Sequence, residues 1–175
     1  ISFIKNNFLT FHLRPKSSEN FENISTFIPP DKKFAIIIQG NIGEYFSFLL
    51  ESVNIYKKIF PNTLIIVSTW EDEDNSKINE LKKFVHHVVI NKKPKEPAYG
   101  NINFQIISTY AGLKIAEANG VEFCLKTRAD CRMHKTDILP FLEGLIDQFP
   151  IHNKNVCNSR IIASSVNTCK YKVYG

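Results

Sequence analysis

The sequence predicts an α/β fold with a mostly parallel central sheet and flanking helices, and three observations support this. Residues Phe34–Gln39 and Thr63–Ser68 are nearly continuous apolar runs, which is typical of parallel strands covered on both faces. Between them, apolar residues recur at spacings of three and four, as in an amphipathic helix: Phe46, Leu49, Val53, Tyr56 and Phe60. Strand, helix and strand within about 35 residues form a βαβ unit, which brings the connecting loops to a common edge of the sheet.

Composition indicates a single folded domain. The chain has 175 residues, of which 43% are hydrophobic and 22% charged, as in ordinary globular proteins. Its net charge of +5 suits an anionic partner, such as a nucleotide diphosphate or a phospholipid surface, although a basic solvated surface has the same composition. The basic residues are dispersed and do not alternate with aromatic residues, so we expect no nucleic-acid binding.

The four cysteines show no C-x-x-C spacing and no histidine pair at a zinc-ligand distance: Cys124, Cys131, Cys157 and Cys169. We therefore expect no zinc site, a buried Cys124 and a reducing, cytoplasmic location. No apolar run approaches the roughly 18 residues that span a bilayer. Residues 1–33 have the composition of an extension or linker, and residues 34–175 are expected to form one domain, incomplete at its C-terminal end.

The remaining elements follow from the same patterns. A strand is predicted at Leu9–Leu13, a polar helix at Asn75–Lys83, and a strand at Phe84–Ile90 with His86 and His87 on opposite faces. A helix from Asn101 to the stop at Gly120 is predicted to bury Ile102, Ile106, Tyr110, Leu113 and Ala116, and a buried strand follows at Val121–Leu125. A helix capped by Thr136 or Asp137 is predicted to bury Leu139, Leu142, Leu145, Ile146 and Phe149, before a last strand at Arg160–Ser164.

Four predicted strand ends carry polar and charged residues, at Gln39–Asn41, Ser68–Asp74, Ile90–Lys93 and Lys126–Arg132. Open α/β sheets bind ligands outside the carboxyl ends of their strands, so we expect these groups to share one rim. The first strand is followed by Gly40-Asn-Ile-Gly43 rather than by G-x-G-x-x-G, and the chain has no G-x-x-x-x-G-K-[ST] loop. Dehydrogenases, methyltransferases and P-loop proteins are therefore disfavoured.

An ordered set of motifs resembles the WavE lipopolysaccharide-synthesis family: Ile36–Gly40, Tyr56–Pro61, Ile65–Trp70, Asn103–Leu113 and Leu125–Asp130. The resemblance covers Phe34–Met133 and continues weakly to Thr168. It implies a GT-A-like, nucleotide-diphospho-sugar transferase fold. It also implies a glycosyltransferase that moves a sugar from a nucleotide sugar donor to a lipopolysaccharide or surface-glycan acceptor.

The resemblance also implies a phosphate and metal site. GT-A enzymes commonly place a D-x-D motif on Mn²⁺ or Mg²⁺, and the matching tripeptide here is Arg128-Ala-Asp130, which keeps only the last carboxylate. Asp130 is thus the candidate metal ligand, while Arg128 and Lys126 could contact phosphate directly. Alternatively, Asp130 could be a helix-cap or loop carboxylate, and Lys126 could form a structural ion pair with Asp130 or Glu71. Metal dependence stays open.

The same resemblance extends the donor site. Gln105, Ser108 and Gly112 share one side of a predicted helix, so Gln105 could contact the donor or simply bond to a neighbouring loop. Trp70 could stack on the base, with Glu71 accepting from it, although a lone Trp also suits a core. The full predicted binding set is Gln39, Gly40, Asn41, Ser68, Thr69, Trp70, Glu71, Gln105, Lys126, Arg128 and Asp130.

Two further expectations concern partners and catalysis. The acceptor is expected to be a glycan or lipid-linked molecule, with peripheral contact at the inner face of a membrane favoured by the net positive charge. No residue is assigned as catalytic base, because such a base is expected beyond the end of this chain. The rival function is a non-catalytic nucleotide-sugar-binding domain whose D-x-D motif is degenerate.

Overall fold

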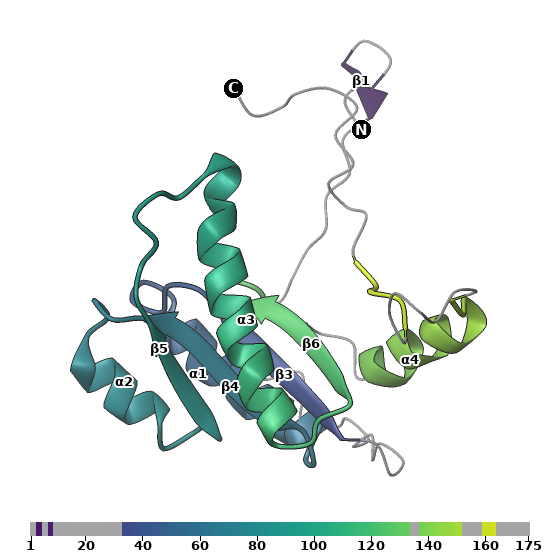
Figure 1. Ribbon diagram of the computed structural model, residues 1–175, viewed down its shortest axis with the longest axis horizontal. Coiled ribbons are helices and arrows are strands. Elements are labelled where there is room, and N and C mark those ends of the chain that lie inside the picture. Colours follow the sequence, from purple (N-terminus) through teal and green to yellow (C-terminus); the bar gives the residue numbers. More distant parts are fainter. Residues whose placement is uncertain (1–2, 5–6, 9–32, 134–136, 152–158, 164–175) are drawn as a thin grey trace.

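The computed structural model of the protein describes residues 3–4, 7–8, 33–133, 137–151 and 159–163. A two-stranded antiparallel pair, β1 (Phe3–Ile4) and β2 (Asn7–Phe8), precedes the main body. The main body contains, in chain order, β3 (Phe34–Gln39), α1 (Phe46–Ile59), β4 (Leu64–Trp70), α2 (Asn75–Leu81), β5 (His87–Asn91), the 3₁₀ turn η2 (Tyr99–Asn101), α3 (Ile102–Ala118), β6 (Phe123–Arg128) and α4 (Ile138–Gln148) (Figure 1).

The central sheet has four strands in the order β5-β4-β3-β6, and all of its pairings are parallel. This confirms the predicted α/β class. The register pairs Gln39 with both Ser68 and Arg128, and Trp70 with Asn91, so the carboxyl ends of the four strands lie at one edge. The central strands β3 and β4 are buried almost throughout, as the continuous apolar runs predict.

Each face of the sheet is covered by a helix. On one face, alternate residues of the central strands, including Ile36 and Val67, pack in the main core with Val53 and Tyr56 of α1. On the opposite face, Ile37 lies in a smaller cluster whose other buried members are Ala35, Ile66 and Ala116 of α3. Figure 1 shows α3 lying across this second face of the sheet.

Helix α3 packs on the sheet through small residues rather than through its predicted apolar stripe. Its buried residues are Ser108, Gly112 and Ala116, and a Cβ atom on Gly112 would lie 2.5 Å from Ile37 Cγ2. Four large residues of the predicted stripe are exposed instead: Ile102, Ile106, Tyr110 and Leu113. Of the predicted stripe, only Ala116 is buried. The orientation prediction was wrong because close approach of helix and sheet requires the side without bulky side chains.

The predicted strand at Phe84–Ile90 begins three residues too early. The N–H groups of Phe84 and Val85 both donate to Leu81 O, which continues the turn that ends α2. His86 lies before β5, its N–H donating to Ile65 O and its Nδ1 accepting from Ile65 N–H. The two histidines therefore do not alternate within one strand. In contrast, β4 runs two residues past the predicted Ser68 and includes Thr69 and Trp70.

Strand β6 is an edge strand rather than a buried one. Phe123 and Leu125 are half-buried and pack against the main core, while Cys124 and Lys126 on the other face are exposed. The prediction of a buried Cys124 was wrong, because α3 packs mainly on β3 and β4 and leaves this face of β6 uncovered. The strand also extends through Arg128, so the basic residues predicted to follow it are part of it.

The C-terminal predictions hold only in part. Helix α4 forms and buries Leu139, but Asp137 provides no side-chain cap and Phe149 is exposed. Residues 160–163 form no strand, which contradicts that prediction for the described part of the segment. The predicted strand Leu9–Leu13, and Thr136, Cys157, Ser164 and Cys169, lie outside the described residues. Among the described helices, none combines the length and hydropathy needed to cross a bilayer.

Candidate functional site

An open cavity of about 350 Å³ lies at the carboxyl edge of the sheet. It lies where the strand order reverses. After β3 the chain adds β4 and then β5 on one side of it, and it then crosses back to place β6 on the other side of β3. Ligands of open α/β sheets bind at such reversal points. The cavity is lined by Gln39, Gly40, Asn41, Tyr45, Trp70, Lys93, Gly100, Asn101, Phe104, Gln105, Arg128, Ala129 and Asp130.

The loop after β3 forms part of the cavity lining, and Glu73, which does not line the cavity, holds this loop in place. Gly40 has φ +117°, a left-handed conformation that favours glycine, and a Cβ at this position would meet no atom within 4 Å. Glu73 fixes the rest of the loop, since its Oε1 accepts from Ile42 N–H at 2.7 Å and from Thr69 Oγ1 at 3.2 Å. Backbone without a side chain therefore faces the cavity at Gly40, where a ligand can approach closely.

The neighbouring end of β6 carries an ion pair between Arg128 and Asp130. Arg128 Nε donates to Asp130 Oδ1 at 2.8 Å, and Arg128 Nη2 donates to Asp130 Oδ2 at 2.5 Å. Burial raises the pKa of Asp130, but the hydrogen bonds and charge of Arg128 outweigh it and hold the pKa below its usual value. Asp130 is therefore an ionised carboxylate with both oxygens engaged.

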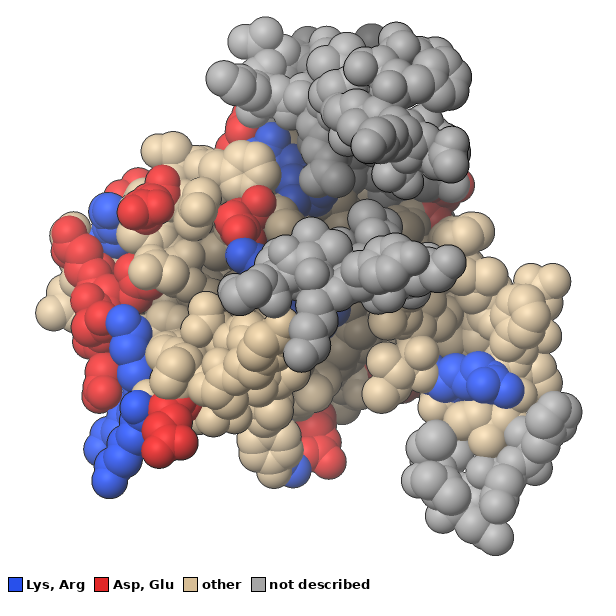
Figure 2. Space-filling view, turned by 90° about the horizontal axis from the view of Figure 1, so that it is seen from above, with Lys and Arg blue, Asp and Glu red and all other residues tan. Residues whose placement is uncertain are grey.

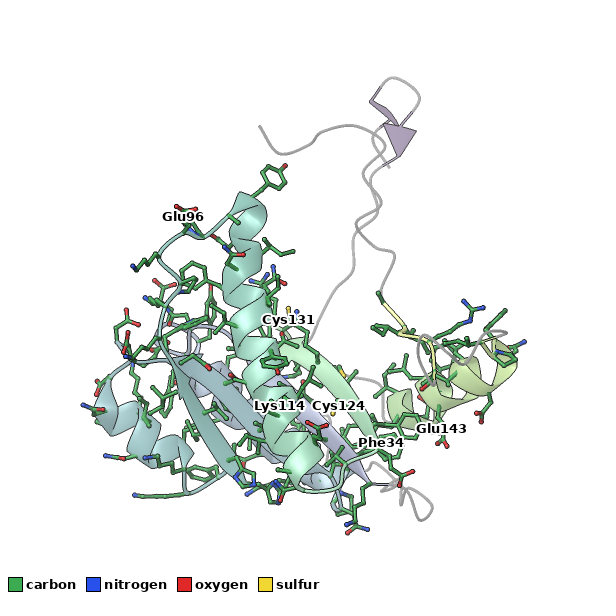
Figure 3. All side chains as sticks on the ribbon, viewed as in Figure 1. Phe34, Glu96, Lys114, Cys124, Cys131 and Glu143 are labelled. Atoms are coloured by element: carbon green, nitrogen blue, oxygen red, sulfur yellow. The ribbon has the colours of Figure 1, made fainter. Side chains whose placement is uncertain are left out.

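The segment just beyond this pair is anchored firmly. Arg132 is buried, donates to Ser52 Oγ at 2.8 Å and to Glu51 Oε2 at 2.6 Å, and stacks over the Phe48 ring. Met133 N–H donates to Tyr56 O–H at 3.0 Å. Cys131 lies at this end of β6, whereas Cys124 lies farther down the strand (Figure 3). The chain that carries Asp130 is thus fixed to α1 on its C-terminal side.

Gln39 and Gln105 connect α3 to the site. Ser108 Oγ, which is buried, donates to Gln39 Oε1 at 2.8 Å, linking α3 to the end of β3. Lys126 Nζ lies 3.4 Å from Gln105 Oε1, a long hydrogen bond beside the cavity. The ion pair considered for Lys126 with Asp130 or Glu71 does not form within the described part of the chain. Burial lowers the pKa of Lys126, and the positive charge of Arg128 lowers it further.

Aromatic rings form a further part of the cavity lining. Trp70 is only 3% exposed, and its ring meets Phe104 edge to face at a centroid distance of 5.0 Å. Tyr45 is 42% exposed at the start of α1. Trp70 therefore lines the cavity from within a packed cluster, whereas Tyr45 presents an accessible ring.

Seven of the eleven predicted binding residues line the cavity: Gln39, Gly40, Asn41, Trp70, Gln105, Arg128 and Asp130. Ser68 and Thr69 are fully buried beneath it, and the Asn91 amide donates to Ser68 Oγ and to Thr69 O, each at 2.8 Å. Glu71 is exposed, and Lys126 reaches the site only through Gln105. None of these four residues lines the cavity.

The predicted binding set omitted several lining residues, chiefly Tyr45, Asn101 and Phe104. Lys93 also lines the cavity; it belonged to the predicted rim group Ile90–Lys93 but was not named as a binding residue. Phe104 precedes Gln105 on the same helical turn, so helical geometry could have suggested it. Asn101 has φ +59°, which no sequence pattern marked. Lys93 pairs with Asp72 on the α2 side of the molecule, where acidic and basic side chains lie close together (Figure 2).

The predicted Mn²⁺ or Mg²⁺ site finds little support in this arrangement. Hard divalent cations need several free oxygen ligands. Among the described residues, Asp130 is the only carboxylate that lines the cavity, and Arg128 engages both of its oxygens. The described residues contain no group of three or more His, Cys, Asp or Glu side chains that could hold a metal. The side chains therefore do not fit a cation held by the protein alone.

A protein-family model described as WavE lipopolysaccharide synthesis matches residues 34–173 of the chain. The matched range contains every residue that lines the cavity. No curated protein and no solved structure matches the chain.

Proposed function

The chain belongs to the WavE lipopolysaccharide-synthesis family, and from this premise we propose that it is a glycosyltransferase that binds a nucleotide-diphospho-sugar in the cavity and transfers the sugar to a surface-glycan acceptor. The observation that carries the proposal is the position of the cavity. It lies between the ends of β3 and β6, where the strand order reverses, and it combines backbone at Gly40 with cationic and aromatic side chains. Family membership supports a role in lipopolysaccharide synthesis, and the lining of the cavity supports a nucleotide sugar as the donor.

The chemistry of sugar transfer suits the charged wall. When the bond between an anomeric carbon and a diphosphate breaks, negative charge develops on the leaving phosphate and must be stabilised. Arg128 offers a planar fork that can hold two phosphate oxygens, and Lys93 supplies a second cation at the β5 side of the cavity. Gly40 lets the diphosphate approach the backbone. In this proposal the cationic side chains bind the diphosphate.

The aromatic wall suits the nucleoside. Tyr45, Phe104 and Trp70 line the cavity, and an aromatic ring face packs well on a flat base. Because Trp70 is packed against Phe104, we place the accessible stacking surface at Tyr45 rather than at Trp70. Gln39 and Gln105 then stand between the nucleoside and phosphate ends as hydrogen-bonding groups.

Calorimetric titration with UDP-, GDP- and CMP-sugars, with and without Mn²⁺, tests the donor site. Arg128→Met and Lys93→Met should weaken binding at least about tenfold, because each removes a phosphate-binding charge. Lys58→Met, on the exposed C-terminal turn of α1, removes the same charge away from the cavity and should bind normally. Saturable binding that is lost in both site variants supports the proposal, and a wild type that binds none of these donors refutes it.

A second function, a non-catalytic nucleotide-sugar-binding domain, is favoured by one observation. Arg128 occupies the position of the first acidic residue of the D-x-D motif, and it engages Asp130, the one carboxylate in the described lining of the cavity. Release of free nucleotide during incubation with donor and lipopolysaccharide acceptor separates the two functions. Transfer supports the enzyme, while tight binding without release or transfer supports the binding domain.

The acceptor and the membrane contact are also proposals. A lipid-linked acceptor would be reached at an anionic membrane surface, which the net charge of +5 favours. Co-sedimentation with vesicles containing anionic phospholipid should exceed that with neutral vesicles and fall as salt is added. Equal co-sedimentation with both kinds of vesicle would contradict the proposal.

A further inference from the structure

The pairing of Arg128 with Asp130 has the geometry of a phosphate complex. A guanidinium holds a carboxylate and a phosphate in the same way, with two parallel N–H donors facing two oxygens. Here those donors are Nε and Nη2, at 2.8 Å and 2.5 Å from the two Asp130 oxygens. Both residues line the cavity, next to Cys131, which is labelled in Figure 3. The carboxylate thus occupies one of the two edges with which the Arg128 guanidinium can hold a phosphate.

The pair is also exposed enough to be exchanged. The Arg128 side chain is 55% exposed and that of Asp130 is 25% exposed. Because the pair is partly open to solvent, a competing anion can reach it, and breaking it costs on the order of 1 kcal/mol, which corresponds to about a three- to tenfold factor in affinity. Lys126 lies close enough to Arg128 for the two charges to interact, so a ligand with two negative charges would meet more positive charge than the single carboxylate neutralises. The diphosphate of a nucleotide sugar is such a ligand.

The neighbouring arginine shows the contrast. The side chain of Arg132 is only 1% exposed, and Ser52, Glu51 and the Phe48 carbonyl all accept from it. That arrangement anchors the chain and offers no access to a ligand. Of the two arginines in this segment, one is locked into the fold and the other, Arg128, meets a single carboxylate at the cavity wall.

We propose that Asp130 is an internal substitute for the donor phosphate: its carboxylate fills the Arg128 fork while the cavity is empty, and a nucleoside diphosphate displaces it on binding. This inference rests on the proposed function, because it concerns the same site. Asp130 then competes with the ligand and lowers its affinity, which is the opposite of the effect expected of a residue that binds the donor directly. The competition also lowers the affinity for weakly binding anions, because a ligand must bind this edge of Arg128 more strongly than the carboxylate does in order to displace it.

Binding of UDP and GDP to the full chain, measured by calorimetry in EDTA, tests the exchange. Asp130→Asn and Asp130→Ser should each bind at least one nucleoside diphosphate about three- to tenfold more tightly than wild type, since each removes the competing charge. The gain should vanish in an Arg128→Met background, because no fork remains to be released. Glu117→Gln removes an equal charge from the exposed Lys114–Glu117 pair on α3 and should leave affinity unchanged. Thermal melts confirm that each variant is folded.

The outcomes separate this inference from the proposed function. If wild type binds a nucleoside diphosphate but both Asp130 variants bind it equally or more weakly, the exchange is refuted while the proposed function stands. If neither wild type nor the Asp130 variants bind any nucleoside diphosphate in EDTA, the exchange is refuted; the proposed function is refuted as well only if no nucleotide sugar binds with Mn²⁺ present. A gain in affinity that persists in the Arg128→Met background also refutes the exchange, since it would show that Asp130 repels the ligand without occupying Arg128.

Discussion

The packing of α3 on the sheet predicts opposite effects for the same substitution at two helical glycines. Gly112→Ala would place a Cβ 2.5 Å from Ile37 Cγ2, about 1 Å closer than ordinary van der Waals contact. Ile37 is fully buried in the central strand β3, and its β-branched side chain has few alternative rotamers. The methyl group therefore cannot be accommodated without moving the helix away from the sheet.

The magnitude follows from two opposing terms. Adding a methyl group to a packed core costs about 1–3 kcal/mol, and replacing glycine inside a helix by alanine returns about 0.5–1 kcal/mol. Gly112→Ala should therefore destabilise by roughly 1 kcal/mol, within a range of about 0–2.5 kcal/mol. At Gly144 of α4 a Cβ meets no atom within 4 Å, so Gly144→Ala should instead stabilise by about 0.5–1 kcal/mol.

Urea unfolding of both variants measures these changes, and a melting scan should show shifts of about 2–4 °C per kcal/mol for a chain of this size. A second readout connects packing to the site, because Phe104 and Gln105 on α3 line the cavity. Lifting α3 should weaken nucleotide-sugar binding in Gly112→Ala and leave it unchanged in Gly144→Ala. Equal stabilisation by both substitutions would refute the close-packing argument.

Two further predictions concern the supports of the site and of the sheet. Glu73→Ala removes the acceptor of the buried Ile42 N–H and should lower the free energy of unfolding in urea by about 1–3 kcal/mol. Glu73→Gln keeps an oxygen there and should lower it less. Equal losses in the two variants would contradict this role of Glu73. Burial, with Lys57 and His87, holds the pKa of His86 below its usual value of about 6.5, so the unfolded chain binds this proton more readily. The resulting stability is present above about pH 6.5 and is lost as the pH falls below it, so the wild-type melting temperature should drop more between about pH 7.5 and 5.5 than that of His86→Asn. Equal drops would contradict the role of His86.

Sequence reasoning succeeded where a single physical factor dominates. A strand covered on both faces must be apolar throughout, and β3 appears exactly at the predicted Phe34–Gln39 for that reason. Parallel pairing then brings the ends of four strands to one edge of the sheet. Of the seven predicted residues that line the cavity, all except Gln105 lie at or just after these strand ends, and they could therefore be predicted from strand positions before their contacts were known.

It failed where neighbouring elements compete for space. The large apolar residues of α3 suggested its buried face, but Ser108, Gly112 and Ala116 at spacings of four allow a closer approach and bury that side instead. β6 shows the same limit, because an apolar run does not reveal whether a helix covers both faces of the strand. The Arg128–Asp130 pair depends on side-chain rotamers, which leave no pattern in the sequence, whereas Lys93 belonged to the predicted rim group Ile90–Lys93 because it follows the end of β5 closely.

The most direct test of the central claim is a map of backbone amide chemical shifts as a nucleotide sugar is added. If the donor binds at the carboxyl edge, the largest changes should occur at Gly40, Asn41, Tyr45, Asn101 and Asp130. Amides at the opposite end of the sheet, such as those of Leu64, His87 and Phe123, should hardly change. Saturable changes confined to that opposite end, or no changes with any donor, would contradict the account.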